Sequence, residues 1–99
     1  MGIYLVTLRP PRENFVEDAT PAEEATVDAH FEYLKKLEAE KKLLLAGRTD
    51  EGTPTGILLL RAASPEEARR LIELDPAVKA GIFRVELKPF RLAIMSGNG

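Results

Sequence analysis

The chain has 99 residues, 44% of them hydrophobic, which predicts one domain over residues 1–99 and favours association with a second copy. The net charge of −2 at pH 7 excludes a broad nucleic-acid-binding surface, because such a surface needs a clustered basic face. The absence of cysteine and the presence of one histidine exclude disulfides, thiolate zinc sites, a cysteine nucleophile and a histidine-rich metal site.

A strand and a long loop are predicted first. Ile3–Leu8 is a short apolar run typical of a buried strand. The N-terminus carries neither a basic segment nor a long apolar run, so we expect no signal peptide, no membrane span and a cytoplasmic protein. Arg9–Thr20 contains prolines and turn-forming residues and predicts a loop, whose length is typical of a functional or mobile segment.

A helix is predicted from its N-cap, Thr20, to about Lys42. Pro21 suits the first helical position, and Glu23 completes a capping box with Thr20. The apolar stripe has residues three or four apart: Val27, Phe31, Leu34 and Leu37. His30 lies on this face. Because imidazole titrates near neutral pH, His30 is either a core histidine bonded to a backbone carbonyl or a general acid/base in a pocket.

Two strands and a turn follow. Leu43–Ala46 and Thr55–Ala62 are apolar runs that predict strands, and Arg48–Pro54 predicts the turn between them. Gly47 and Gly52 belong to no phosphate-binding glycine pattern, so no nucleotide site is predicted.

A second helix over Ser64–Leu74 repeats the start signal of the first, with Ser64 as the N-cap and Glu67 closing a capping box. Its inner stripe is apolar: Ala68, Leu71 and Ile72. Asp75 continues this stripe, and the proline that follows it ends the helix. Pro76–Ala80 predicts one further turn, stopped by Gly81 in a left-handed conformation.

The last strand is predicted over Ile82–Leu87. Pro89 interrupts the pattern, which suits an edge strand or a bend. Phe90–Met95 either extends this strand or pairs with a partner. Residues 96–99 are expected to be frayed.

This order of elements, β-α-β-β-α-β, predicts an α+β ferredoxin-like fold. Its four-stranded antiparallel sheet carries both helices on one face. The other face stays uncovered, and either Leu58 and Leu60 or Ile57 and Leu59 point toward it. A homodimer with sheets packed face to face would bury this apolar face.

The fold turns His30 and Asp75 into a candidate pair. Antiparallel helices bring the first half of one helix and the end of the other to the same end of the sheet. Facing an aspartate is the usual way to tune an imidazole. Asp75 is also a good cap for the turn that follows. The two roles are compatible, since one carboxylate oxygen caps while the other orients the imidazole.

The chain resembles the YCII-related family of YciI-like proteins from Ile3 to about Ile94. The motifs occur in a fixed order: the histidine-led helix of His30–Gly47, the turn Asp50-Glu51-Gly52, the cap Ser64-Pro65-Glu66-Glu67-Ala68, the segment Leu74–Phe83 with Asp-Pro and Ala-Gly, and the ending Val85–Leu92 with Pro-Phe. Each motif is unspecific by itself, whereas the ordered set is specific. The chain departs from the family at Arg48, where a proline commonly follows Ala-Gly.

The resemblance implies a ferredoxin-like fold that pairs into a dimeric α/β barrel. It also implies an active site built on the family's histidine and aspartate, whose motif positions His30 and Asp75 occupy. At least one family member resembles a dehydrochlorinase acting on a hydroxylated chloroaromatic, with proton transfer assigned to this pair. We therefore expect an active site that needs neither cofactor nor metal.

The leading functional hypothesis is a small enzyme in which Asp75 fixes the imidazole tautomer and His30 moves a proton on a small, cyclic or aromatic substrate. Elimination, isomerisation and hydrolysis all fit. Arg48, Asp50 and Tyr4 are further substrate-binding candidates, although turn and core positions also explain them.

The alternative hypothesis is a non-catalytic, small-ligand-binding or sensing dimer that uses the same pocket. A cofactor-free oxygenase is a third hypothesis, but such sites commonly use more aromatic groups than the six present. An RNA-binding role is excluded because Thr55–Ala62 offers no aromatic residue for stacking bases.

Overall fold

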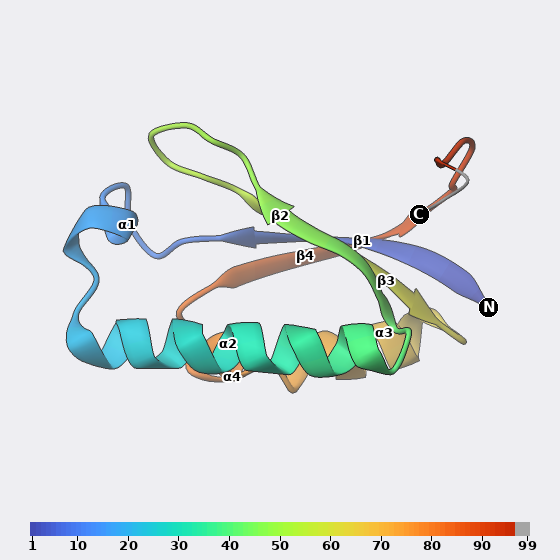
Figure 1. The fold of residues 1–99 in the computed structure, drawn as a ribbon, viewed down its shortest axis with the longest axis horizontal. Coiled ribbons are helices and arrows are strands. Elements are labelled where there is room, and N and C mark those ends of the chain that lie inside the picture. Colours follow the sequence, from blue (N-terminus) through green and yellow to red (C-terminus); the bar gives the residue numbers. More distant parts are fainter. Residues whose placement is uncertain (97–99) are drawn as a thin grey trace.

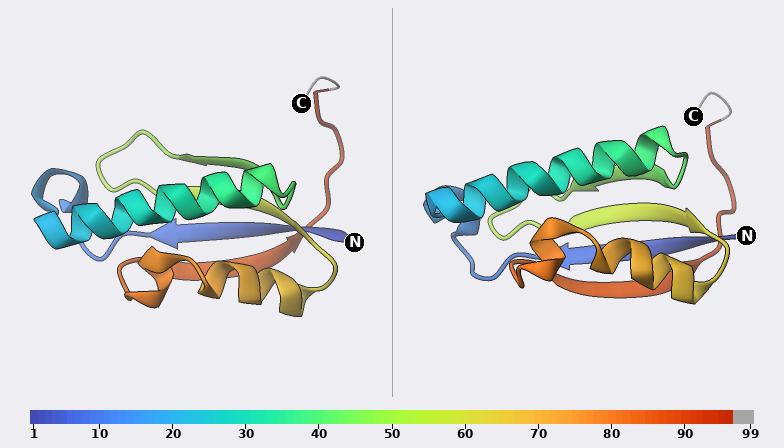
Figure 2. Two further views of the ribbon diagram at one scale, coloured as in Figure 1. Left: turned by 60° about the horizontal axis from the view of Figure 1, so that its bottom comes forward. Right: turned by 90° about the horizontal axis from the view of Figure 1, so that it is seen from below.

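The computed structural model describes residues 1–96, in which four antiparallel strands form one sheet with the order β2-β3-β1-β4 (Figure 1). The strands are β1 (Gly2–Arg9), β2 (Leu43–Arg48), β3 (Gly56–Ala62) and β4 (Arg84–Phe90). The helices are α1 (Phe15–Asp18), α2 (Pro21–Ala39), α3 (Pro65–Glu73) and α4 (Pro76–Lys79). Helix α2 and the α3–α4 segment cover one face and run in opposite directions (Figure 2). The predicted ferredoxin-like α+β fold is confirmed.

The core lies between the sheet and the long helices. Because strand residues alternate between faces, Tyr4, Val6 and Leu8 of β1 point together toward the helices. They meet buried residues of β3 and the helices: Leu34, Leu37, Leu58, Leu60, Ala62, Leu71 and Ile72. Gly56 faces Leu8, where a Cβ would come within 3.2 Å of the Leu8 Cβ. This packing fixes the helices over the sheet, since each buried aliphatic side chain contributes about 1.5–3 kcal/mol.

The other face of the sheet carries apolar side chains without a covering helix. Ile57 and Leu59 point to it, whereas Leu58 and Leu60 lie in the core, which decides between the two alternatives. Leu45, which pairs with Leu59, is 49% exposed. An apolar band therefore crosses β2 and β3 on the side away from α2 and α3.

Helix α2 begins as predicted and ends earlier. Thr20 and Glu23 form the predicted capping box, with distances of 3.1 and 2.8 Å between the bonded atoms. The helix ends at Ala39 instead of about Lys42 because the N–H of Lys42 donates to the carbonyl of Leu37 at 2.8 Å. This is a Schellman motif, a hydrogen-bonded ending that stops further helical bonding. No helix within residues 1–96 is long and apolar enough to cross a membrane.

A second Schellman motif closes α4, where the N–H of Ile82 donates to the carbonyl of Ala77 at 2.9 Å. Gly81 takes the left-handed position with a φ of 75°, as predicted. The equivalent position after α2 is Lys41, with a φ of 63°. The two endings thus share a geometry, but one places a side chain where glycine is favoured.

Three other sequence predictions need correction. The loop Arg9–Thr20 contains the one-turn helix α1. Phe31 is 53% exposed, because it lies about 100° around the helix from His30, outside the buried stripe. Glu67 accepts a hydrogen bond from the N–H of Ala63 at 2.7 Å, not from that of Ser64, so Ser64 caps α3 without completing a capping box.

The strand boundaries also shift. β2 ends at Arg48 and β3 begins at Gly56. The connecting turn therefore begins and ends one residue later than the predicted Arg48–Pro54. Strand β4 begins at Arg84, because the α4 ending occupies the two preceding residues. It continues through Pro89, which is tolerated because β4 is an edge strand. Residues 91–96 form no strand, and residues 97–99 of the predicted frayed tail lie outside the described residues.

Lys41→Gly is expected to raise the free energy of unfolding by about 1 kcal/mol, because glycine removes the cost of a Cβ in the left-handed region. Denaturant unfolding measures the change. The matched control, Lys36→Gly, places glycine inside the helix and should lower stability by about 1 kcal/mol. A loss of stability in both variants would contradict this assignment.

Candidate functional site

The two titratable groups predicted to meet do so inside the protein. His30 comes from the middle of α2, and Asp75 lies at the junction of α3 and α4. The distance from His30 Nδ1 to Asp75 Oδ2 is 2.5 Å. The two residues are 4% and 0% exposed. Such a short, water-excluded contact joins two helices through a charge-assisted hydrogen bond.

The Asp75 carboxylate uses both of its oxygens. While Oδ2 contacts His30, Oδ1 accepts a hydrogen bond from the Ala77 N–H at 2.8 Å and so caps α4. The backbone of Asp75 is extended, as the following Pro76 requires. Since an ionised carboxylate only accepts hydrogen bonds, the proton of the contact sits on His30 Nδ1.

The imidazole ring is held between aromatic side chains. Its centroid lies 5.1 Å from that of Phe31 and 5.3 Å from that of Phe83, both in edge-to-face arrangements. Nε2 makes no hydrogen bond within residues 1–96. Among these residues, Thr7 Oγ1 is the fully buried side-chain polar atom without a partner, so Nε2 is not fully buried. Nε2 therefore keeps solvent contact, and His30 lines a cavity. The neutral ring offers a lone pair to that cavity.

The cavity measures about 650 Å³ and lies between α2, the sheet and the loop after β1. This volume is within the range of small-molecule sites, about 300–1,000 Å³. Its apolar wall includes Leu8, Leu34, Leu58 and Phe83. The charged lining residues are Glu24, Asp28 and Arg48. An apolar chamber with a few charges and one free imidazole nitrogen suits a small ring-shaped ligand.

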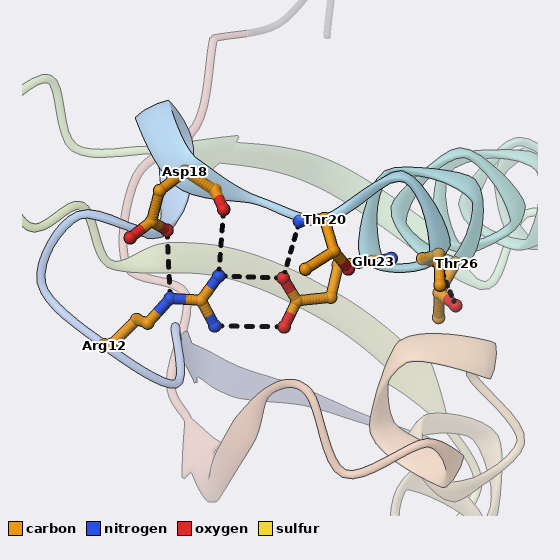
Figure 3. A network of polar contacts seen from close by, with 6 residues as sticks. Arg12, Asp18, Thr20, Glu23 and Thr26 are labelled. Atoms are coloured by element: carbon orange, nitrogen blue, oxygen red, sulfur yellow. Dashed lines mark hydrogen bonds and ion pairs between the residues drawn. The ribbon is translucent and has the colours of Figure 1, made fainter.

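The loop after β1 forms one wall of the cavity and is fastened by Arg12 (Figure 3). The Arg12 guanidinium binds Glu23 through both terminal nitrogens, at 3.0 and 2.8 Å, and Asp18 at 2.9 Å. It also lies 5.4 Å from the ring centroid of Phe15, a residue that lines the cavity. The pKa of Glu23 is lowered to about 2, first by the hydrogen bond from Arg12 and then by the backbone N–H of Thr20.

A second contact between helices lies near the pair. The Tyr33 hydroxyl donates to the carbonyl of Leu71 at 2.5 Å, which joins α2 to α3. Burial raises the pKa of Tyr33, and the negative charge of Asp75 acts in the same direction. Tyr33 therefore stays a neutral donor, and it keeps the two helices at the separation that the pair needs.

The remaining predicted site residues lie in different places. Arg48 lines the cavity, and the one hydrogen bond of its side chain within residues 1–96 is a 3.5 Å contact to the Thr49 carbonyl. Asp50 is exposed in the turn after β2, and Tyr4 is 7% exposed in the core; neither lines the cavity. Within residues 1–96, no group of three His, Cys, Asp or Glu side chains is placed to hold a metal ion.

Sequence reasoning missed the aromatic contacts of the site. Phe15 and Phe83 meet edge to face, with ring centroids 6.2 Å apart, and both line the cavity. Phe83 follows the α4 ending, and its contact with His30 depends on how that turn packs against α2. One aromatic residue in a proline-rich loop is the signal that points to Phe15.

Comparisons with known proteins agree with this structure. The model of the YCII-related domain family matches residues 4–91. The uncharacterized protein YjpA of Bacillus subtilis (strain 168) is 35% identical over 66 residues, which are 67% of this chain and 76% of that protein.

A solved structure shares the fold. It is 5-chloro-2-hydroxyhydroquinone dehydrochlorinase (TftG) from Burkholderia phenoliruptrix AC1100, in complex with 2,5-dihydroxybenzoquinone. The TM-score is 0.68 at 22% identity, with 91% of this chain and 95% of the other covered.

Asp75→Asn is expected to reverse the imidazole tautomer. The Oδ1 atom of the asparagine still accepts the hydrogen bond from the Ala77 N–H, so its NH₂ group faces His30 Nδ1. Nδ1 must then accept a hydrogen bond from this group instead of donating one. The ring proton therefore moves from Nδ1 to Nε2. Two-bond ¹H–¹⁵N correlation spectra of the neutral ring report the change, with Glu66→Gln as the charge-matched control. Persistence of the Nδ1–H form in Asp75→Asn would contradict this geometry.

Arg12→Ala is expected to raise the pKa of Glu23 from about 2 toward its ordinary value of 4.5, because the strongest hydrogen bond to the carboxylate is lost. A ¹³C NMR titration of the carboxyl measures it. In the wild type, the stabilisation from this contact is complete above pH 4.5 and is lost as the pH falls toward 2. Lys35→Ala, which breaks the Lys35–Glu32 pair, is the control and leaves the Glu23 value unchanged. An unshifted Glu23 in Arg12→Ala would contradict the ion pair.

Proposed function

Because the chain belongs to the family of YCII-related domains, we propose that it is a small acid/base enzyme whose His30–Asp75 pair transfers a proton on a small cyclic or aromatic substrate. The observation that carries this proposal is the buried Nδ1–Oδ2 contact, combined with an Nε2 that stays open to a cavity. A histidine that only fills the core needs neither a buried carboxylate on Nδ1 nor an Nε2 that faces a cavity.

In the proposed reaction, Nε2 of His30 removes a proton from an acidic O–H or C–H bond of the bound ring. The electron pair of that bond moves into the ring, and a group such as chloride leaves with its own electron pair when the reaction is an elimination. The ionised Asp75 stabilises the imidazolium and holds the ring in place. The proton then passes to water, or to another substrate atom when the reaction is an isomerisation. This chemistry needs no cofactor.

The lining of the cavity supports a substrate class. The aromatic rings of Phe15 and Phe83, together with the aliphatic wall, favour a flat ring of modest size. TftG, which shares the fold, is a dehydrochlorinase of a hydroxylated ring and was solved with a dihydroxybenzoquinone. We infer a hydroxylated ring for this chain as well, with Arg48 as a neighbouring cation.

We further infer that the enzyme is a homodimer. The uncovered sheet face carries the partly exposed Ile57 and the half-exposed Leu45, and Leu92 in the segment after β4 is 38% exposed. Burying this apolar area against a second copy would remove it from water. A non-catalytic dimer that senses the same ligands remains the competing hypothesis, and turnover separates the two.

The test measures chloride release and solvent deuterium incorporation with 5-chloro-2-hydroxyhydroquinone first and related hydroxylated rings next. We expect turnover by the wild type, and a loss of roughly 10²–10⁴-fold in His30→Gln, because a glutamine cannot accept the proton. Glu66→Gln, an exposed control, retains the activity. Ring binding without turnover, equal in wild type and His30→Gln, would favour the sensing dimer.

A further inference from the structure

Two arginines stand side by side at one end of the sheet. Arg9, the last residue of β1, is the cross-strand partner of Arg84, the first residue of β4. Cross-strand partners project from the same sheet face, about 4.5–5.5 Å apart at Cβ, and like charges placed so are destabilising. No ion pair within residues 1–96 includes either arginine. The chain thus keeps an unfavourable pair of positive charges without a carboxylate between them.

Both arginines line a second cavity of about 530 Å³. Its other walls include Thr53, Thr55 and Gly81. The two cavities share three lining residues: Pro10, Pro54 and Phe83. Phe83 is the aromatic residue whose ring lies 5.3 Å from that of His30. Because Leu8 points toward the helices, Arg9 and Arg84 project from the opposite face of the sheet, away from α2 and His30.

We propose that Arg9 and Arg84 bind an oxyanion group, a carboxylate or a phosphate, of a small-molecule ligand in this second cavity. Oxyanion binding by the two arginines does not rest on the proposed function. Each guanidinium offers a planar set of donors that matches two oxygens of such a group. A bound dianion would also offset the repulsion between the two cations.

The surrounding charges support a localised site. Glu86 follows Arg84 on the same face of β4 and faces Thr7 of β1 across the ladder. Lys88 comes next on that face and faces Leu5. The second cavity is lined by neither Glu86 nor Lys88. An anion in this cavity would therefore contact two arginines. Lys88 lies outside the cavity and serves as a control.

The experiment titrates inorganic phosphate into the ¹⁵N-labelled protein, with sodium chloride at equal ionic strength as the reference and sodium acetate as the carboxylate arm. We expect saturable shifts of the backbone amides near Gly81 and Arg84 with phosphate, with acetate or with both, and none with chloride. Arg84→Gln and Arg9→Gln should each weaken the Kd by about tenfold, the loss of one charge-assisted hydrogen-bonded contact. Lys88→Gln should bind as the wild type does.

Thermal unfolding gives a second measurement that separates a site from a folding defect. Without added anion, Arg84→Gln should have a higher Tm than the wild type, because it removes like-charge repulsion. At the same phosphate concentration, the Tm of the wild type should rise more than that of Arg84→Gln. His30→Gln should bind phosphate normally, so loss of turnover and loss of oxyanion binding are distinguishable.

Two results would overturn the proposal. One is a set of amide shifts that grow without saturation or persist equally in Arg9→Gln and Arg84→Gln. The other is a loss of self-association in Arg84→Gln, measured by sedimentation velocity, with no effect of phosphate on the wild type. That second result would mean that carboxylates of another copy, not a ligand, neutralise the two arginines.

Discussion

The Asp75 carboxylate is the interaction on which the site depends. One of its oxygens holds the first turn of α4, and the other holds the imidazole of α2. Removing the imidazole would leave a buried carboxylate oxygen without its donor, which typically costs about 1–3 kcal/mol and more for a charged group. The contact that would prepare His30 for the proposed chemistry therefore also fixes α2 against α3 and α4, and the Tyr33–Leu71 hydrogen bond joins the helices a second time.

Local patterns predicted much of this arrangement. The Thr20 capping box and the Asp-Pro step at Asp75 depend on residues within a few positions, and the structure confirms both. The alignment of His30 and Asp75 followed from two helix periodicities and one topology, since antiparallel helices leave little choice of which ends meet. Patterns of this kind depend on spacing alone, so a sequence is sufficient to reveal them.

What the sequence did not reveal depends on contacts distant in the chain. Phe83 contacts His30 only because the turn after α4 packs beside α2, and no spacing in the sequence relates them. Arg12 finds Glu23 because α1 folds the loop back on itself. The ending of α2 was missed for another reason: Lys41 occupies a left-handed position that sequence rules reserve for glycine.

The double use of Asp75 has a consequence for how related sequences can diverge. A descendant that abandoned proton transfer would still need a short side chain at position 75 to start the turn after the proline step. At position 30 it would need only a side chain that donates to the buried carboxylate oxygen. If the proposed proton transfer holds, asparagine or glutamine in place of the histidine, beside a retained aspartate, would therefore mark a lineage that kept the architecture without that chemistry.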